Sequence, residues 1–130
     1  MSIRDNLITD ITAKLSGHTS FGISSELPYL TSDTPLYMRN KRTVYVDELQ
    51  ENVTELYRVL DSSDIVQTES TCTAYLAVDA KNQPTDIQTV VANLLLSKDS
   101  ITAQIKSSEV TTELENDIIL YNIEYNFTTV

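Results

Sequence analysis

The feature that most constrains the fold is a strict alternation near the end of the chain, over residues 117–127. One set of alternating positions collects the large apolar side chains Ile119, Tyr121, Ile123, Tyr125 and Phe127. The positions between them carry Leu120, Asn122, Glu124 and Asn126. A period of two, with β-branched and aromatic residues on one side, is typical of a strand with one buried face. The sequence therefore predicts that the chain closes inside a sheet, with Val110–Glu115 as the hairpin partner through Asn116 and Asp117.

Further strand-like segments lie upstream. A run over about Glu69–Asp79 alternates in the same way and predicts a long strand, one face of which carries Cys72, Ala74, Leu76 and Val78. Leu36–Met38 and Thr43–Asp47 read as short strands joined by a hairpin through Asn40. Residues 52–60 fit either a helix or a strand, and their Val, Thr and Tyr content favours the strand. A short extended segment is expected over Ile101–Ile105.

Two segments have helical spacing. An apolar stripe of Ile3, Leu7, Ile11 and Leu15 predicts an N-terminal helix, with Ser2 as its N-cap and Gly17 in a left-handed conformation at its end. Over about residues 85–97, the positions i, i+3, i+4, i+7 and i+8 are held by Ile87, Val90, Val91, Leu94 and Leu95. We therefore predict the α+β class: a mostly antiparallel β-sheet covered by these two α-helices, with a C-terminal β-hairpin, in one domain over residues 1–130.

Composition narrows the classes of protein. The net charge of −10 repels phosphate backbones and argues against ordinary nucleic-acid binding. Cys72 is the single cysteine, so no intramolecular disulfide is possible. The start of the chain has no signal-peptide pattern, and no apolar stretch approaches membrane-spanning length. We expect a soluble protein that folds in a reducing cytoplasm and does not enter a membrane.

Motifs that carry chemistry are sparse. The single histidine, His18, follows Gly17 and has no catalytic partner that the sequence identifies. The acidic residues Asp61 and Asp64 could supply oxygens to a cation, but the glycine and distal glutamate of an EF-hand loop are missing, which favours a turn. Two glycines cannot build a phosphate cradle. We therefore expect no catalytic residues, no cofactor and no metal.

Charge is unevenly distributed along the chain. Basic residues gather at Arg39, Lys41 and Arg42, whereas residues 43–80 and 109–124 are strongly acidic. A basic turn on an acidic subunit suits head-to-tail contact with another copy, which closes into a ring if the rotation permits. A basic loop in solvent is the alternative. The candidate interface residues are Arg39, Lys41, Arg42, Asp47, Glu48, Glu113 and Glu115.

The layout resembles the tail terminator, or tail-completion, proteins of tailed bacteriophages. The matching pieces are an amphipathic helix at Arg4–Leu15, a sheet run ending at Tyr75–Ala80, a helix at Thr85–Leu96 and a closing strand at Ile118–Phe127. They cover most of the chain and match in architecture rather than through an invariant motif. The resemblance implies a virion structural protein at the tail–neck junction, assembled in the host cytoplasm, with no catalytic residues.

Such proteins form rings, usually homohexamers, that cap the tail tube, stop its polymerisation and join it to the neck or head-completion proteins. The resemblance therefore implies three partners: other copies of the chain, the tail tube protein and a neck protein. DNA would pass through the ring channel without specific binding, which an acidic subunit favours. Alternatives are another phage head–tail connector or stopper, a small non-viral adaptor or assembly module, and an enzyme using dispersed carboxylates such as Asp47, Glu48 and Asp79.

Overall fold

The structure is a computed structural model that describes residues 3–28, 35–57, 65–95, 104–115 and 117–129. Its elements follow in the order α1 (Ile3–Lys14), β1 (Gly22–Ser24), α2 (Leu36–Arg39), β2 (Thr43–Val46), β3 (Gln50–Tyr57), β4 (Ile65–Asp79), α3 (Ile87–Leu95), β5 (Gln104–Glu115) and β6 (Ile118–Thr129). The predicted α+β class is confirmed. The long strand, the closing strand and both longer helices form where the periodicity placed them.

The strands form one six-stranded sheet in the order β1-β2-β4-β6-β5, to which β3 adds through β4. The pair β1–β2 is parallel and every other pair is antiparallel. Strand β4 organises the sheet: it pairs with β6 along residues 68–79, and its other edge pairs first with β3 and then with β2. The C-terminal hairpin is confirmed, because β5 and β6 pair up to Glu115 and Ile118.

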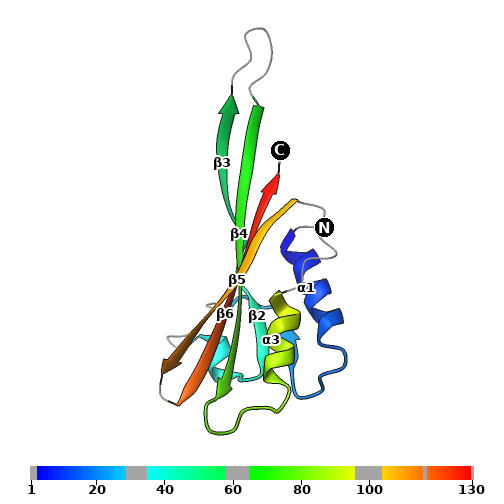
Figure 1. The fold of residues 1–130 in the computed structure, drawn as a ribbon, viewed down its shortest axis with the longest axis vertical. Helices are drawn as coiled ribbons and strands as arrows, with labels where there is room; N and C mark the ends of the chain where they lie inside the picture. The colour runs from blue at the N-terminus through cyan, green and yellow to red at the C-terminus, as the bar shows by residue number, and fades with distance from the viewer. Residues whose placement is uncertain (1–2, 29–34, 58–64, 96–103, 116, 130) are drawn as a thin grey trace.

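One face of the sheet is covered by α1 and α3, which lie side by side (Figure 1). The core between these layers contains the predicted apolar faces. From the helices it takes Leu7, Ile11, Leu15, Ile87, Val90, Val91 and Leu94; from the sheet it takes Val44, Val46, Cys72, Ala74, Leu76, Val78, Tyr121, Ile123, Tyr125 and Phe127. The alternation in β4 and β6 is thus explained by burial of this face.

A two-stranded arm extends from one end of this sheet (Figure 1). The last β4–β6 pair is Thr68 with Thr129. Beyond it, residues 65–67 of β4 pair with β3 and with no other described strand, as far as Ile65 opposite Tyr57. We call β3 together with residues 65–71 of β4 the arm. The strand predicted over residues 52–60 is confirmed as far as Tyr57, and residues 58–60 lie outside the described residues.

One predicted strand and its hairpin are wrong. Residues Leu36–Arg39 form the short helix α2, not a strand that pairs with Thr43–Val46. Pro35 precedes α2 with φ −58°, the angle that its ring imposes and that suits a helix start. The N–H of Asn40 closes this turn on the carbonyl of Leu36. The run of three apolar residues, Leu36–Met38, is too short for hydrophobic periodicity to distinguish a helix from a strand.

Two smaller expectations also change. Gly17 does not have positive φ. The helix α1 is instead followed by a turn in which the backbone N–H of His18 donates to Leu15 O at 2.9 Å. The extended segment predicted at 101–105 is not separate: Gln104 and Ile105 already belong to the long strand β5. Ser2, residues 101–103 and Asn116 lie outside the described residues, as do residues 96–97 of the second predicted helix.

Candidate functional site

The face of the sheet opposite α1 and α3 is the candidate functional surface. Cross-strand partners project on the same side of a sheet, so the register identifies its members. We call it the open face; its central rows hold Thr71, Thr73, Tyr75, Ala77, Glu109, Thr111, Glu113, Leu120, Asn122, Glu124 and Asn126. Polar side chains predominate in this set, which is expected for a face that α1 and α3 do not cover. The short helix α2 packs against one part of it, where Tyr37, Tyr45 and Ala77 are buried together.

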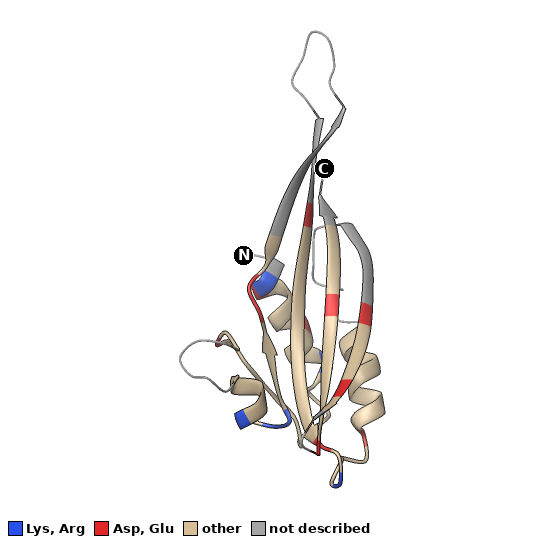
Figure 2. Cartoon of the chain, turned by 90° about the vertical axis from the view of Figure 1, so that its left-hand side faces the viewer, with Lys and Arg blue, Asp and Glu red and all other residues tan. Residues whose placement is uncertain are grey.

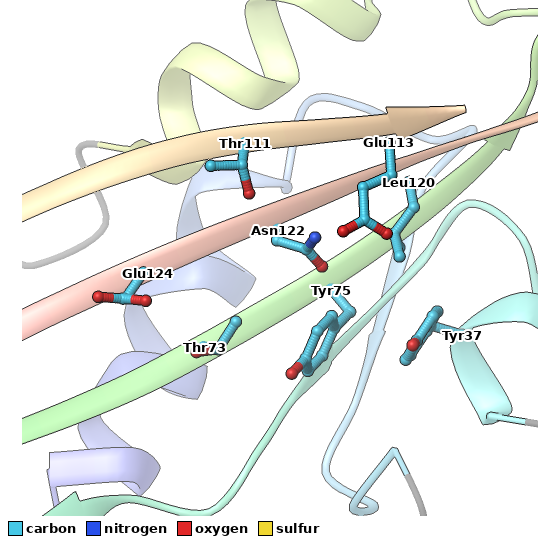
Figure 3. A pocket seen from close by; sticks show the side chains of 8 residues that line it. All are labelled: Tyr37, Thr73, Tyr75, Thr111, Glu113, Leu120, Asn122 and Glu124. Atoms are coloured by element: carbon cyan, nitrogen blue, oxygen red, sulfur yellow. The ribbon is translucent and has the colours of Figure 1, made fainter. Parts of the chain in front are cut away.

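The open face is hollowed by a shallow depression of about 390 Å³ (Figure 3). Its lining comes from α2, β4, β5 and β6 and consists of Tyr37, Thr73, Tyr75, Thr111, Glu113, Leu120, Asn122 and Glu124. The rings of Tyr37 and Tyr75 stack with centroids 4.7 Å apart and planes 14° apart. The short helix α2 therefore places the ring of Tyr37 beside the ring of Tyr75 on β4.

The depression is rich in hydrogen-bond acceptors. Glu113 and Glu124 line it, and Glu109 lies directly across the strand pair from Glu124. None of these three carboxylates forms an ion pair within the described part of the chain. The side-chain oxygen of Asn122 is shielded from solvent and accepts no hydrogen bond from any described group. Like charges on opposed residues destabilise a sheet, so this surface favours a cationic partner.

The three predicted basic residues differ in their surroundings. The Lys41 ammonium lies 2.9 Å from Asp79 Oδ1. The Arg42 guanidinium donates to Asn82 O at 3.2 Å, and the Arg42 backbone, at φ 67°, donates to Ala77 O. Arg39, the last residue of α2, is exposed and has no ion pair or hydrogen-bond partner among the described residues for its side chain. Of the three, Arg39 is the cation left for another molecule.

The predicted acidic candidates do not come together. Asp47 lies beside β2, where its Oδ1 accepts the N–H of Glu48 at 2.8 Å, and Glu48 is exposed. Glu113 lies in the depression, and Glu115 stands in β5 opposite Ile118, at the hairpin end of the strand. Glu124 and Asn122 were missed as site residues, although their positions between the apolar residues of β6 already assigned them to the other face of that strand.

His18 joins two elements of the helix layer. Its Nδ1 lies 2.6 Å from Asp86 Oδ2, and its Nε2 lies 3.4 Å from Asn93 Nδ2. These contacts connect the turn after α1 to the start and the body of α3. His18 therefore links the two helices that cover the sheet. Asp61 and Asp64 lie outside the described residues. Within the described ranges, no group of three or more His, Cys, Asp or Glu residues could hold a metal ion.

Two ionisable groups of the core have strongly shifted pKa values. Burial raises the pKa of the Cys72 thiol to about 12. Its Sγ donates to Asp47 O at 3.3 Å. Burial likewise raises the pKa of Tyr125, whose hydroxyl donates to the carbonyl of Leu94. Both groups are held in their neutral forms inside the core, where they stabilise packing rather than offer a nucleophile.

None of the helices that the structure describes is long and apolar enough to cross a bilayer. The chain matches no protein-family model, and no curated protein is significantly similar to it.

Proposed function

We propose that this protein is a virion structural protein that acts as the tail terminators of tailed phages do. It forms a ring, most simply a hexamer, that caps the tail tube, stops its polymerisation and joins it to the neck or head-completion proteins. The observation that carries the proposal is the charge asymmetry of the open face. The carboxylates without an ion pair among the described residues lie on β6 and β5. Arg39, whose side chain also has no partner among those residues, ends α2, which packs against β2 and β4 (Figure 2).

Opposite charges on opposite sides of one surface favour a head-to-tail contact between identical subunits. Each subunit then uses its basic side toward one neighbour and its acidic side toward the other. Such a heterologous contact generates a closed ring when the rotation between subunits divides a full turn. Charges at the rim of an interface also steer association and fix the register of the partners. The asymmetry thus supports contact between copies of the chain, which a cyclic assembly can use.

The arm supplies a second element that the proposal uses. Beyond Thr68 its two strands pair only with each other within the described residues, so they extend past the body of the sheet. An isolated two-stranded ribbon has little stability of its own in water. It gains stability when it packs against another surface. We assign the arm to contact with the tail tube or with an adjacent subunit.

The proposal also covers activity, DNA passage and location. In it, the protein is not an enzyme and uses no cofactor. DNA passes through the channel of the ring without specific binding, because the net charge of −10 disfavours retention of phosphates. Its place is the junction of tail and neck in the virion.

Two measurements test the proposal. Native mass spectrometry or electron microscopy of the purified protein, alone and with the tail tube protein encoded in the same genome, should show a cyclic homo-oligomer. Tubes polymerised with the protein present should be shorter and should carry a ring at one end. A protein that stays monomeric under both conditions and leaves the tube length unchanged would contradict the proposal.

A further inference from the structure

We propose that the depression on the open face binds the guanidinium group of Arg39 from a neighbouring copy of the chain. The inference rests on the proposed function, since it names the contact that would hold the ring together. The depression is then the acceptor side of the head-to-tail contact, and the end of α2 is the donor side (Figures 2 and 3).

The lining of the depression matches the chemistry of a guanidinium. Arginine presents five N–H donors in a plane and no acceptor. The depression offers the carboxylates of Glu113 and Glu124 as acceptors. A planar cation also stacks favourably on aromatic rings, and the half-buried Tyr75, backed by the buried Tyr37, lies at one side of the hollow. A lysine would use the charge but not the planar stacking.

Arg39 is the donor that the described residues leave available. Lys41 is held by Asp79, Arg42 by the carbonyl of Asn82, and Lys81 lies 3.7 Å from Asp117. Near the N-terminus, the Arg4 guanidinium donates to Val46 O at 2.9 Å. Arg39 is exposed and has no such contact. The Arg39 guanidinium can therefore bind a neighbouring copy without breaking an interaction with a described residue of its own subunit.

The contact joins two copies and is not internal. Arg39 does not line the depression of its own chain, and no ion pair connects it to Glu113 or Glu124. Donor and acceptor thus lie at different places on the same surface. Each subunit can then give one contact to a neighbour and receive one from another, as the subunits of a closed ring do.

Charge reversal at Arg39 tests the contact. Arg39→Glu should raise the subunit dissociation constant about tenfold or more at low salt, because close charge pairs in interfaces carry coupling of that size. Lys81→Glu is the matched control: it changes the net charge equally at another exposed position and should assemble like the parent. Mass photometry over a dilution series measures both. Arg39→Ala, which adds no repulsion, should give a smaller loss in the same direction.

Reciprocal reversal makes the test specific. Glu124→Arg should weaken assembly as Arg39→Glu does, and the combination of both changes in one chain should restore part of the loss. Circular dichroism should show each variant folded. If Arg39→Glu and Arg39→Ala form rings like the parent at low salt, or if the combination is no better than either change alone, the contact is refuted while ring formation stands. If the parent chain itself never forms a ring, the proposed function fails together with this contact.

Discussion

At the scale of single residues, Tyr125 joins the last strand to the helix layer. Its ring is fully buried, and its hydroxyl donates to the carbonyl of Leu94 near the end of α3. The last carbonyls of a helix have no partner within the helix, so this hydroxyl satisfies a group that burial would otherwise leave unpaired.

The change Tyr125→Phe keeps the ring and removes the donor. We expect it to lower the free energy of unfolding by about 1–3 kcal/mol, the cost of a buried group left unsatisfied. Tyr121→Phe is the control, because Tyr121 is buried on the same face and its hydroxyl has no hydrogen-bond partner among the described residues. Urea unfolding of both variants measures the difference. Equal losses for the two variants would show that the hydroxyl of Tyr125 contributes nothing specific.

Cys72 predicts how stability depends on pH at the alkaline end. Burial raises its pKa from 9.0 to about 12; the opposing effect of Arg4 is smaller, and Asp47 adds a further increase. The folded state therefore holds this proton more tightly than the unfolded chain. The corresponding stability is fully present below pH 9 and is lost progressively as the pH rises from about 9 toward 12.

Cys72→Ala removes this titration. Between pH 8 and 10.5, we expect the free energy of unfolding of the parent to fall more steeply than that of the variant, as followed by urea unfolding at each pH. Ionisable groups that do not interact with Cys72 contribute equally to both proteins and cancel in the comparison. Parallel curves for the two proteins would show that the thiol does not become harder to ionise on folding.

At the scale of elements, the packing of α3 on the sheet supports the fold. Leu94 is fully buried in the core that β4 and β6 provide, whereas Leu114 on β5 is 72% exposed. Leu94→Ala should cost about 2–5 kcal/mol, from lost burial and the cavity that remains. The same change at Leu114 should stay within about 0.5 kcal/mol. Thermal and urea unfolding compare the two variants, and a small loss at Leu94 would place α3 off the core.

The sequence predicted those elements in which periodicity and burial agree. Strand β6 and helix α3 each bury one face, so hydrophobic spacing alone identified them. Helix α2 was missed because Leu36–Arg39 is shorter than any period that could distinguish it. Its start depends on Pro35, and its position depends on packing of Tyr37 against Tyr75. Tertiary contacts of this kind are not encoded in local spacing.

The candidate site was predictable only in part, for a related reason. Arg39 and Glu113 were identified from charge clustering along the chain. The depression, however, combines residues of α2, β4, β5 and β6, which meet only through the strand register. The distinction between Arg39 and its neighbours Lys41 and Arg42 also required coordinates, because each neighbour is held by a group distant in sequence.

At the scale of the whole molecule, the sheet divides into a helix-covered body and an arm that extends past it (Figure 1). The buried core lies in the body, between α1, α3 and the strands β2, β4 and β6. Strand β4 belongs to both parts, since its residues 74–75 pair with β2 and its residues 65–67 pair only with β3. The body should therefore fold without the outer part of the arm.

Shortening the arm separates folding from assembly. In the variant, residues 54–67 are replaced by Asn-Gly, a pair that favours a tight hairpin turn, so that Val53 and Thr68 keep their pairing. The shortened protein should unfold cooperatively at nearly the temperature of the parent, because the core formed by α1, α3 and the described side chains of the sheet is kept intact. It should no longer cap tail tubes or close stable rings, as judged by electron microscopy and mass photometry. A shortened protein that caps tubes like the parent would remove the arm from the assembly contact. Loss of cooperative unfolding would show instead that the arm stabilises the body.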